Sequence, residues 1–164
     1  MGLDMYLSRR VFIGNEYRAN KNMELVRLTG SDAGSWGEPH GIKDERISYI
    51  PEGVGYWRKA NAIHAWFVRN AQDGKDECQE SPVTREQLQE LLDLCRKVIG
   101  NAKNLSGIDK ELAEKELSPQ GGFFFGSTDM DDGYFEDLKH TISILEPILA
   151  VEQDAGEYSY HASW

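Results

Sequence analysis

The segment at residues 56–67 combines aromatic, amide, imidazole and cationic side chains beside an apolar stripe of helical spacing. An indole stacks on flat rings, amides and imidazoles form hydrogen bonds along a ring edge, and cations attract an anion. The segment therefore predicts a site for a flat, polar, negatively charged ligand. Its candidate ligand-binding residues are Trp57, Arg58, Lys59, Asn61 and His64. The structural alternative is that Trp57 and His64 border the core while Arg58 and Asn61 are solvated.

The segment at residues 121–129 has the pattern of a glycine turn, a short apolar strand and a small polar turn before a helix. Such a turn at a helix N-terminus presents free amides and hydroxyls, which suit an anion. We therefore expect Gly126, Ser127 and Thr128 to contribute to ligand binding. The structural alternative is a buried strand followed by competing helix caps. The nearby aspartates favour this alternative, since they repel a phosphate. The segment is not a Walker A loop, since Ser127 occupies the lysine position.

The spacing of the reactive side chains favours neither metal binding nor nucleophilic catalysis. No Cys/His pair has zinc-ligand spacing, and Lys139 falls where an EF-hand loop needs a carboxylate. Cys78 has acidic neighbours, which disfavour a thiolate. His64 acting with an aspartate from 129–132 is an acid–base alternative. We assign no catalytic residue and expect no metal site and no cofactor.

Charge and composition exclude further classes of protein. The chain has 164 residues, with 18 basic and 28 acidic side chains, and its formal net charge is −10. The length fits a single domain over residues 1–164. An acidic chain is a poor candidate for binding duplex DNA, which needs a basic protein face.

The longest apolar runs are four residues, so no membrane span is expected. Two unpaired cysteines and the lack of a secretory signal indicate the cytoplasm.

The first half of the chain alternates between strand-like and helical patterns. Residues 3–13 and 23–28 have strand patterns, residues 30–41 that of a loop, and residues 47–50 that of a short strand ended by Pro51. From about residue 54 to 71 the apolar spacing predicts one helix. An acidic connector follows at 72–82.

The second half carries stronger local signals. Thr84 and Gln87 predict a capping box, and Gly100 a helix end. A short helix is expected from Asp109, and a final helix from residue 131 or 132, with a kink or an early end at Pro147. The tail at 157–164 alternates like a strand and is expected beside an N-terminal strand. The predicted fold is α+β, an antiparallel sheet packed by about three main helices.

The chain resembles a family of small proteins encoded by tailed phages and prophages. The resemblance rests on short motifs spread along the chain: Met1 to Leu7 (MGLDMYL), Tyr56 to Phe67 (YWRKANAIHAWF), Asp76 to Cys78, Gly122 to Asp129 (GFFFGSTD), Glu136 to Leu138 and Ser163-Trp164. Met130 departs from the pattern, which has an aromatic residue there. Pro147 and a shortened stretch between Gly100 and Ser118 also depart from it. The resemblance implies a phage setting and action in the host cytoplasm, and it implies no particular activity.

Three functional hypotheses follow from these observations. The leading one is a non-enzymatic phage accessory protein that binds a phosphorylated, nucleotide-like small molecule and sequesters a host defence signal. The first alternative is an acidic inhibitor that covers a host defence protein or nucleic-acid enzyme. The second alternative is a nucleotide-processing enzyme. The expected partner is thus a small molecule or a host protein, not duplex nucleic acid and not a membrane, and the oligomeric state is left open.

Overall fold

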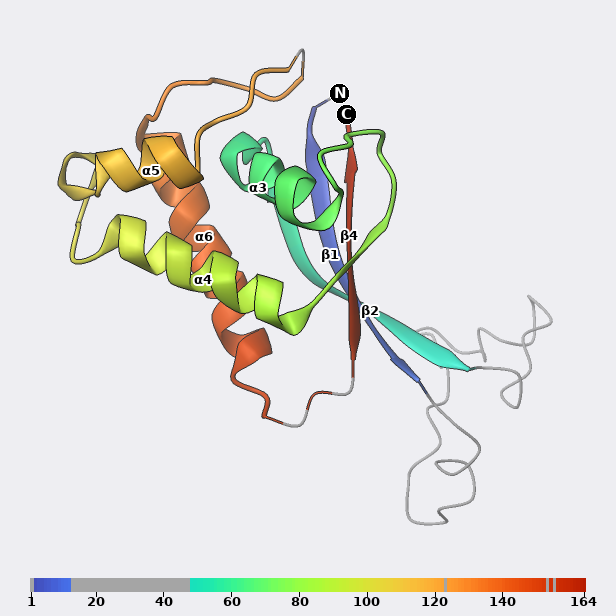
Figure 1. Ribbon diagram of the computed structural model, residues 1–164. Coiled ribbons are helices and arrows are strands. Elements are labelled where there is room, and N and C mark those ends of the chain that lie inside the picture. The colour runs from blue at the N-terminus through green and yellow to red at the C-terminus, as the bar shows by residue number, and fades with distance from the viewer. Residues whose placement is uncertain (1, 13–47, 123, 153, 155) are drawn as a thin grey trace, which may run out of the picture.

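The computed structural model describes residues 2–12, 48–122, 124–152, 154 and 156–164. Its sheet contains four antiparallel strands in the order β2-β1-β4-β3 (Figure 1). The strands are β1 (Asp4–Phe12), β2 (Tyr49–Arg58), β3 (Ser81–Val83) and β4 (Glu157–Ser163). The C-terminal strand pairs with the N-terminal strand, which confirms the position predicted for the tail.

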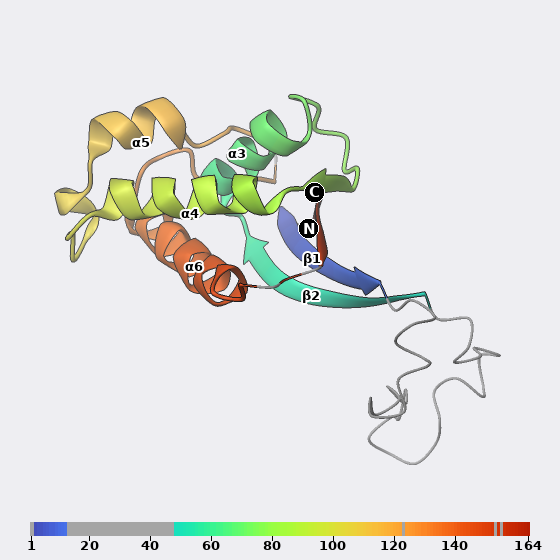
Figure 2. The same cartoon turned by 60° about the horizontal axis from the view of Figure 1, so that its bottom comes forward.

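Helices cover one face of this sheet, and no described element covers the other face (Figure 2). They are α3 (Asn61–Ala71), α4 (Arg85–Ile99), α5 (Lys110–Glu116) and α6 (Asp132–Leu149), with a 3-10 turn at Leu105–Gly107. The α+β prediction is therefore confirmed. Within the described residues, no helix has the length and apolar character needed to cross a membrane.

The core lies between the sheet and the helices. Along β1, Met5 and Leu7 are fully buried, whereas Tyr6 between them is exposed, as the two-residue period of a strand requires. The ring of Tyr160 in β4 stacks on Phe67 of α3 at a centroid distance of 4.0 Å. Each large apolar side chain buried in this way contributes about 2 kcal/mol to folding. This burial fixes which face of each strand is available for function.

Local signals in the second half place the helix ends correctly. The Thr84 hydroxyl accepts from the amide of Gln87, and the Gln87 side chain accepts from the amide of Thr84. Gly100, with φ of 53°, ends α4. Asp109 caps α5 through the amide of Leu112, and Asp131 caps α6. These predictions depend on neighbouring residues only, which is why they are confirmed.

The helix predicted over 54–71 is wrong in its first part. Residues 54–58 belong to β2, and the helix begins only at Asn61. Gly53 and Gly55 disfavour a helix here, and pairing with β1 along the whole length of β2 outweighs the helical spacing. The strand also continues through Pro51, where an end was predicted. Because β2 is an edge strand of the sheet, a proline that donates no hydrogen bond is tolerated.

Two further predictions need correction, and others lie outside the described residues. Helix α6 continues past Pro147 to Leu149, so the early end is wrong. A proline this close to the C-terminus disrupts only the last turn. Phe124 and Phe125 lie in a turn and not in a strand, with the amide of Phe125 donating to the carbonyl of Gly122. The strand at 23–28 and the loop at 30–41 lie outside the described residues.

Candidate functional site

The two segments singled out in the sequence meet at one cavity. It has a volume of about 330 Å³ and lies between the β2–α3 connection and the chain that leads into α6. We call it the junction pocket. Its lining residues are Arg58, Lys59, Asn61, Gly126, Ser127, Asp129, Asp131, Gly133, Tyr134 and Asp137. Five of the eight predicted ligand-binding residues therefore line one pocket.

The β2–α3 connection is a tight turn that holds Lys59 at the pocket. The backbone of Lys59 has φ of 61°, a conformation that costs a non-glycine residue about 1 kcal/mol. Its amide donates to the carbonyl of Leu3 at 2.8 Å, and its carbonyl accepts from the amide of Asn61 at 2.8 Å. The side-chain carbons of Lys59 pack beside Gly126. The turn thus positions a cation against the second segment.

Asn61 joins the two segments through its side-chain amide. The nitrogen donates to the carbonyl of Ser127 at 2.6 Å and to that of Phe125 at 3.2 Å. Both donated bonds satisfy backbone carbonyls, so this nitrogen fixes the loop and is not a free ligand contact. Gly126, between these two carbonyls, has φ of 90°, which glycine adopts without the strain of a side chain.

The N-terminus of α6 is not the open anion cradle that the sequence suggested. The carboxylate of Asp131 accepts from the amide of Tyr134 at 3.0 Å, so a carboxylate of the chain already occupies the N-terminus of this helix. The hydroxyl of Ser127 accepts from the amide of Asp129 at 3.0 Å. The prediction of competing helix caps is thus closer to the structure. Thr128 is exposed and is not among the lining residues.

The junction pocket holds charges of both signs that do not neutralise one another. Among the described residues, no ion pair joins Arg58 or Lys59 to the three lining aspartates. Burial raises the pKa of Asp137 to about 6, the Asp131 charge adds to this shift, and His140 opposes it. Perturbed carboxyl groups in cavities are typical of functional sites.

Trp57 and His64 lie in the core, not on a ligand-facing ridge. Trp57 belongs to β2, is 1% exposed, and donates its indole hydrogen to the Thr141 hydroxyl at 3.0 Å. The predicted site required Trp57 and His64 to lie on one helix, and the helix does not include Trp57. The alternative, in which both residues border the core, is closer to the structure, although both lie inside the core. Its second part is wrong for Asn61, which is 5% exposed.

His64 is fully buried within a polar network. Its Nε2 lies 3.0 Å from the Asp76 carboxylate and its Nδ1 lies 2.8 Å from the Tyr160 hydroxyl. Because a carboxylate only accepts, Nε2 donates its hydrogen to Asp76, and in the neutral imidazole Nδ1 then accepts from the Tyr160 hydroxyl. Asp76 also accepts from the indole of Trp164 at 3.2 Å. This network ties the acidic connector and the C-terminus to α3.

The two cysteines are free and differ in burial. Cys95 is fully buried, and burial raises the pKa of its thiol to about 12. Cys78 is free and partly exposed, and the carboxylate near His64 comes from Asp76. Within the described part of the chain, no group of three His, Cys, Asp or Glu side chains is placed to hold a metal ion.

Sequence reasoning missed the contribution of α6 to the pocket. Asp137 lies four positions after Gly133 and three after Tyr134, which places it on the same side of the helix as both. That spacing was the available signal. It became informative only once the β2–α3 connection was placed opposite this side, and that requires tertiary structure.

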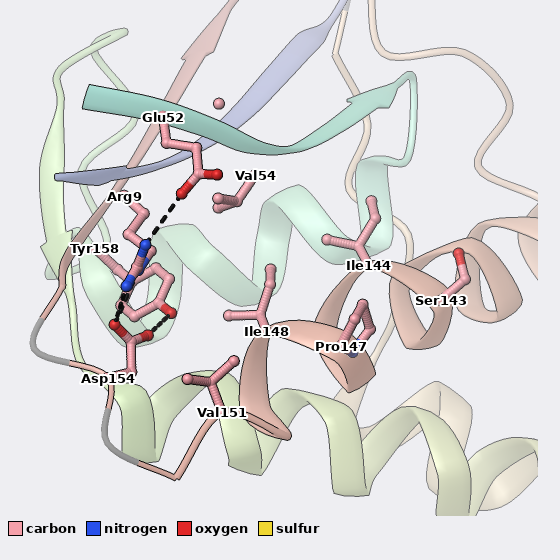
Figure 3. Close-up of a pocket in the computed structure, with 11 residues that line it drawn as sticks. Arg9, Glu52, Val54, Ser143, Ile144, Pro147, Ile148, Val151, Asp154 and Tyr158 are labelled. Carbon is pink, nitrogen blue, oxygen red and sulfur yellow. Dashed lines mark hydrogen bonds and ion pairs between the residues drawn. The ribbon is translucent and has the colours of Figure 1, made fainter. Parts of the chain in front are cut away.

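A larger cavity, which we call the Arg9 groove, lies between β2 and the C-terminal half of α6 (Figure 3). Its volume is about 510 Å³, and its apolar wall includes Val54, Ile144 and Ile148. At its polar end Arg9 pairs with Asp154 at 2.5 Å and with Glu52 at 3.1 Å. No motif in the sequence predicted this groove.

Asp154 is the centre of the polar end of the groove. Its side chain is 2% exposed and accepts hydrogen bonds from Arg9, Arg85 and the hydroxyl of Tyr158. Burial alone would raise the pKa of Asp154, but the hydrogen bonds from Arg9, from the Tyr158 hydroxyl and from the amide of Gly156 lower it to about 2. The polar groups of the groove therefore satisfy one another and leave little for a ligand.

No family model, curated protein sequence or solved structure matches this chain.

Proposed function

We propose that the protein binds a small phosphorylated, nucleotide-like molecule in the junction pocket. The observation that carries this proposal is a partly open cavity of about 330 Å³ whose lining cations and aspartates form no ion pair with one another within the described residues. A cavity of this size lies at the lower end of small-molecule sites, about 300–1,000 Å³. It suits a mononucleotide better than a larger ligand.

The two kinds of charge suit the two ends of such a molecule. Arg58 and Lys59 are exposed cations beside the pocket, and a guanidinium binds phosphate oxygens through two parallel hydrogen bonds. Asp137 is a carboxyl that makes no side-chain hydrogen bond within the described residues. Carboxylates accept hydrogen bonds from ribose hydroxyls and exocyclic amines. A ligand with a phosphate at one end and hydrogen-bond donors at the other therefore pairs with both the cations and the carboxyl of the pocket.

The biological role proposed for this binding is sequestration of a nucleotide signal during phage–host conflict. It rests on the resemblance to small proteins of tailed phages and prophages. A sequestering protein needs a pocket with fixed polar groups and no reactive nucleophile. The core position of His64 and the buried thiol of Cys95 are in keeping with that requirement.

The test is calorimetric titration of the protein with the four common ribonucleoside 5′-monophosphates. Arg58→Ala is expected to weaken binding of the best mononucleotide at least about tenfold, the effect of losing a charged hydrogen-bonded contact. The matched control is Arg96→Ala, which removes an exposed arginine of α4 that pairs with Glu146. Binding of no mononucleotide, or equal losses in both variants, would contradict the proposal.

A second candidate function, a nucleotide-processing enzyme, is favoured by Asp137 alone. A carboxyl whose pKa is about 6 is suited to proton transfer near neutral pH. Mass spectrometry of each mononucleotide after prolonged incubation with the protein separates the two functions. A changed mass that is lost in Asp137→Asn supports an enzyme, and an unchanged mass supports simple binding.

A further inference from the structure

The sheet face opposite the helices carries a concentration of aromatic side chains. We call it the outer face (Figure 2). The large hydrophobic side chains exposed in the described part of the chain include Tyr6, Phe12, Tyr49 and Tyr56. All four alternate with buried or inward-facing residues on β1 and β2, so they point away from the helices. Single exposed aromatics need no explanation, whereas a shared aromatic face indicates an interface.

The strand register arranges this face in rows across β2, β1 and β4. One row is entirely aromatic: Tyr56, Tyr6 and His161 are partners across the three strands. The ring of Tyr6 lies 5.4 Å from that of Tyr56 and 5.9 Å from that of His161. The next row, at Ser8, has only small side chains, with Gly53 and Ser159 as partners. A ridge of rings thus runs beside a row of small residues.

Charged residues flank these two rows with opposite signs on β1. Asp4 lies one row beyond the rings, and Arg10 lies one row beyond Ser8. Arg10 pairs with Glu157 at 2.7 Å, and Asp4 accepts from the hydroxyl of Tyr56. Stacking aromatics also suit single-stranded nucleic acid. That occupant is disfavoured because Asp4 and Glu157 are acidic and the chain carries a net charge of −10.

We infer that the outer face binds a second copy of this chain, face to face, about a two-fold axis that runs across the strands at the level of Leu7. This axis reverses the strand direction in the partner. It places the row of Tyr6 in each copy over the small row of Ser8 in the other copy. It also places Asp4 of each copy over Arg10 of the other. The central rows of the face are therefore complementary to one another in shape and, along β1, in charge, as a two-fold interface requires. Packed sheets of this kind lie about 10 Å apart.

The composition and size of the face fit a moderate interface. Tyrosine, phenylalanine and arginine are enriched at protein interfaces and lysine is depleted, and β1, β2 and β4 contain no lysine. At about 3.4 Å per residue, the length from Asp4 to Phe12 is about 27 Å. Three or four strands at about 4.8 Å spacing give a patch of several hundred Å², near the lower limit for specific dimers. A dissociation constant in the micromolar range is expected.

The test measures molar mass by sedimentation or light scattering as a function of concentration. The wild-type chain of 18.6 kDa is expected to reach twice that mass at about 100 µM, a concentration above a micromolar dissociation constant. Ser8→Arg fills the small row and adds a charge, so this variant is expected to stay monomeric. Ser106→Arg, an exposed serine in the 3-10 turn, is the matched control and keeps the dimer.

A cross-linking experiment tests the register and does not depend on Ser8→Arg folding. In a Cys78→Ser background, Tyr6→Cys and Ser8→Cys proteins are mixed and treated with a short thiol-to-thiol cross-linker, because facing Cα atoms about 10 Å apart exceed the reach of a disulfide. The proposed axis predicts more covalent dimer between the two variants than within either one alone. A monomeric wild type at about 100 µM, a dimer unaffected by Ser8→Arg, or no cross-link between the mixed variants of a dimeric protein would overturn the inference. Tyr6-dependent binding of a single-stranded oligonucleotide by a monomer would overturn it in favour of that ligand.

Discussion

Helix α6 borders two cavities that differ in how their charged groups are satisfied. The Arg9 groove beside its C-terminal half is the larger, at about 510 Å³, yet Arg9 and Asp154 are fully engaged with each other and with their neighbours. The junction pocket at its N-terminus is smaller, at about 330 Å³, and its cations and carboxyls remain apart. Groups that satisfy one another stabilise the fold, whereas groups left unpaired are available to a ligand. Cavity size alone is a poor guide to function.

The largest expected effect of a substitution is on the stability that Asp154 provides. Asp154→Ala leaves Arg9 and Arg85 without their shared anion at a nearly buried position. Because the arginines are partly exposed and screened, we expect a loss of about 2–3 kcal/mol in the free energy of unfolding, somewhat less than for a fully buried pair. Urea titration measures it.

The junction-pocket counterpart of this variant is Asp129→Ala. Asp129 is exposed and forms no ion pair among the described residues. Its removal is expected to change the unfolding free energy by less than about 0.5 kcal/mol. Similar losses for Asp154→Ala and Asp129→Ala would refute the contrast between the two cavities.

The pH dependence of stability is expected to have opposite signs at the two sites. The folded-state pKa of Asp154, about 2, lies below the unfolded value of about 3.9. Its contribution is present above about pH 4 and disappears as the pH falls towards 2. The folded-state pKa of Asp137, about 6, lies above the unfolded value. Its buried charge therefore destabilises the fold above pH 6, and this penalty disappears as the pH falls towards 4.

Asp137→Asn removes this penalty, because the amide carries no charge at any pH. We expect the variant to exceed the wild type in stability by about 1 kcal/mol at pH 7, after allowance for solvent screening, and to equal it near pH 4. Thermal unfolding at both pH values provides the measurement. Glu136→Gln is the matched control, since Glu136 is an exposed neighbour. If both variants respond alike, Asp137 is not the titrating group.

The sequence predicted those parts of the fold that depend on neighbouring residues. Thr84 and Gln87 form the capping box because both partners lie within four residues. The position of Trp57 depends instead on pairing with Met5, more than fifty residues away in the chain. The apolar spacing from about residue 54 predicted a helix that included Trp57, but sheet pairing outweighed it. Periodicity within one segment does not reveal such a partner.

The same distinction applies to the candidate site. Arg58, Lys59 and Ser127 were identified by residue type, and all three line the junction pocket. Their proximity depends on the hydrogen bonds of Asn61 across the fold. The raised pKa of Asp137 results from burial, and burial depends on the folded structure of the whole chain. Residue types therefore indicated the chemistry of the pocket, and packing determined which groups remain available.

The variant Gly126→Ala tests whether the junction pocket depends on the conformation of its loop. Gly126 has φ of 90°, while an added Cβ would lie at an ordinary distance of 3.5 Å from the Cβ of Lys59. The cost is therefore backbone strain and not a clash, about 1 kcal/mol. Gly121→Ala is the control, because it has no positive φ and its nearest neighbour is Thr128 at 3.7 Å. If strain moves the loop, Lys59 and Asn61 lose their fixed positions, and mononucleotide binding falls several-fold in Gly126→Ala but not in Gly121→Ala. Equal affinity in both variants would mean that the loop does not organise the pocket, and that Arg58 alone would have to account for phosphate binding.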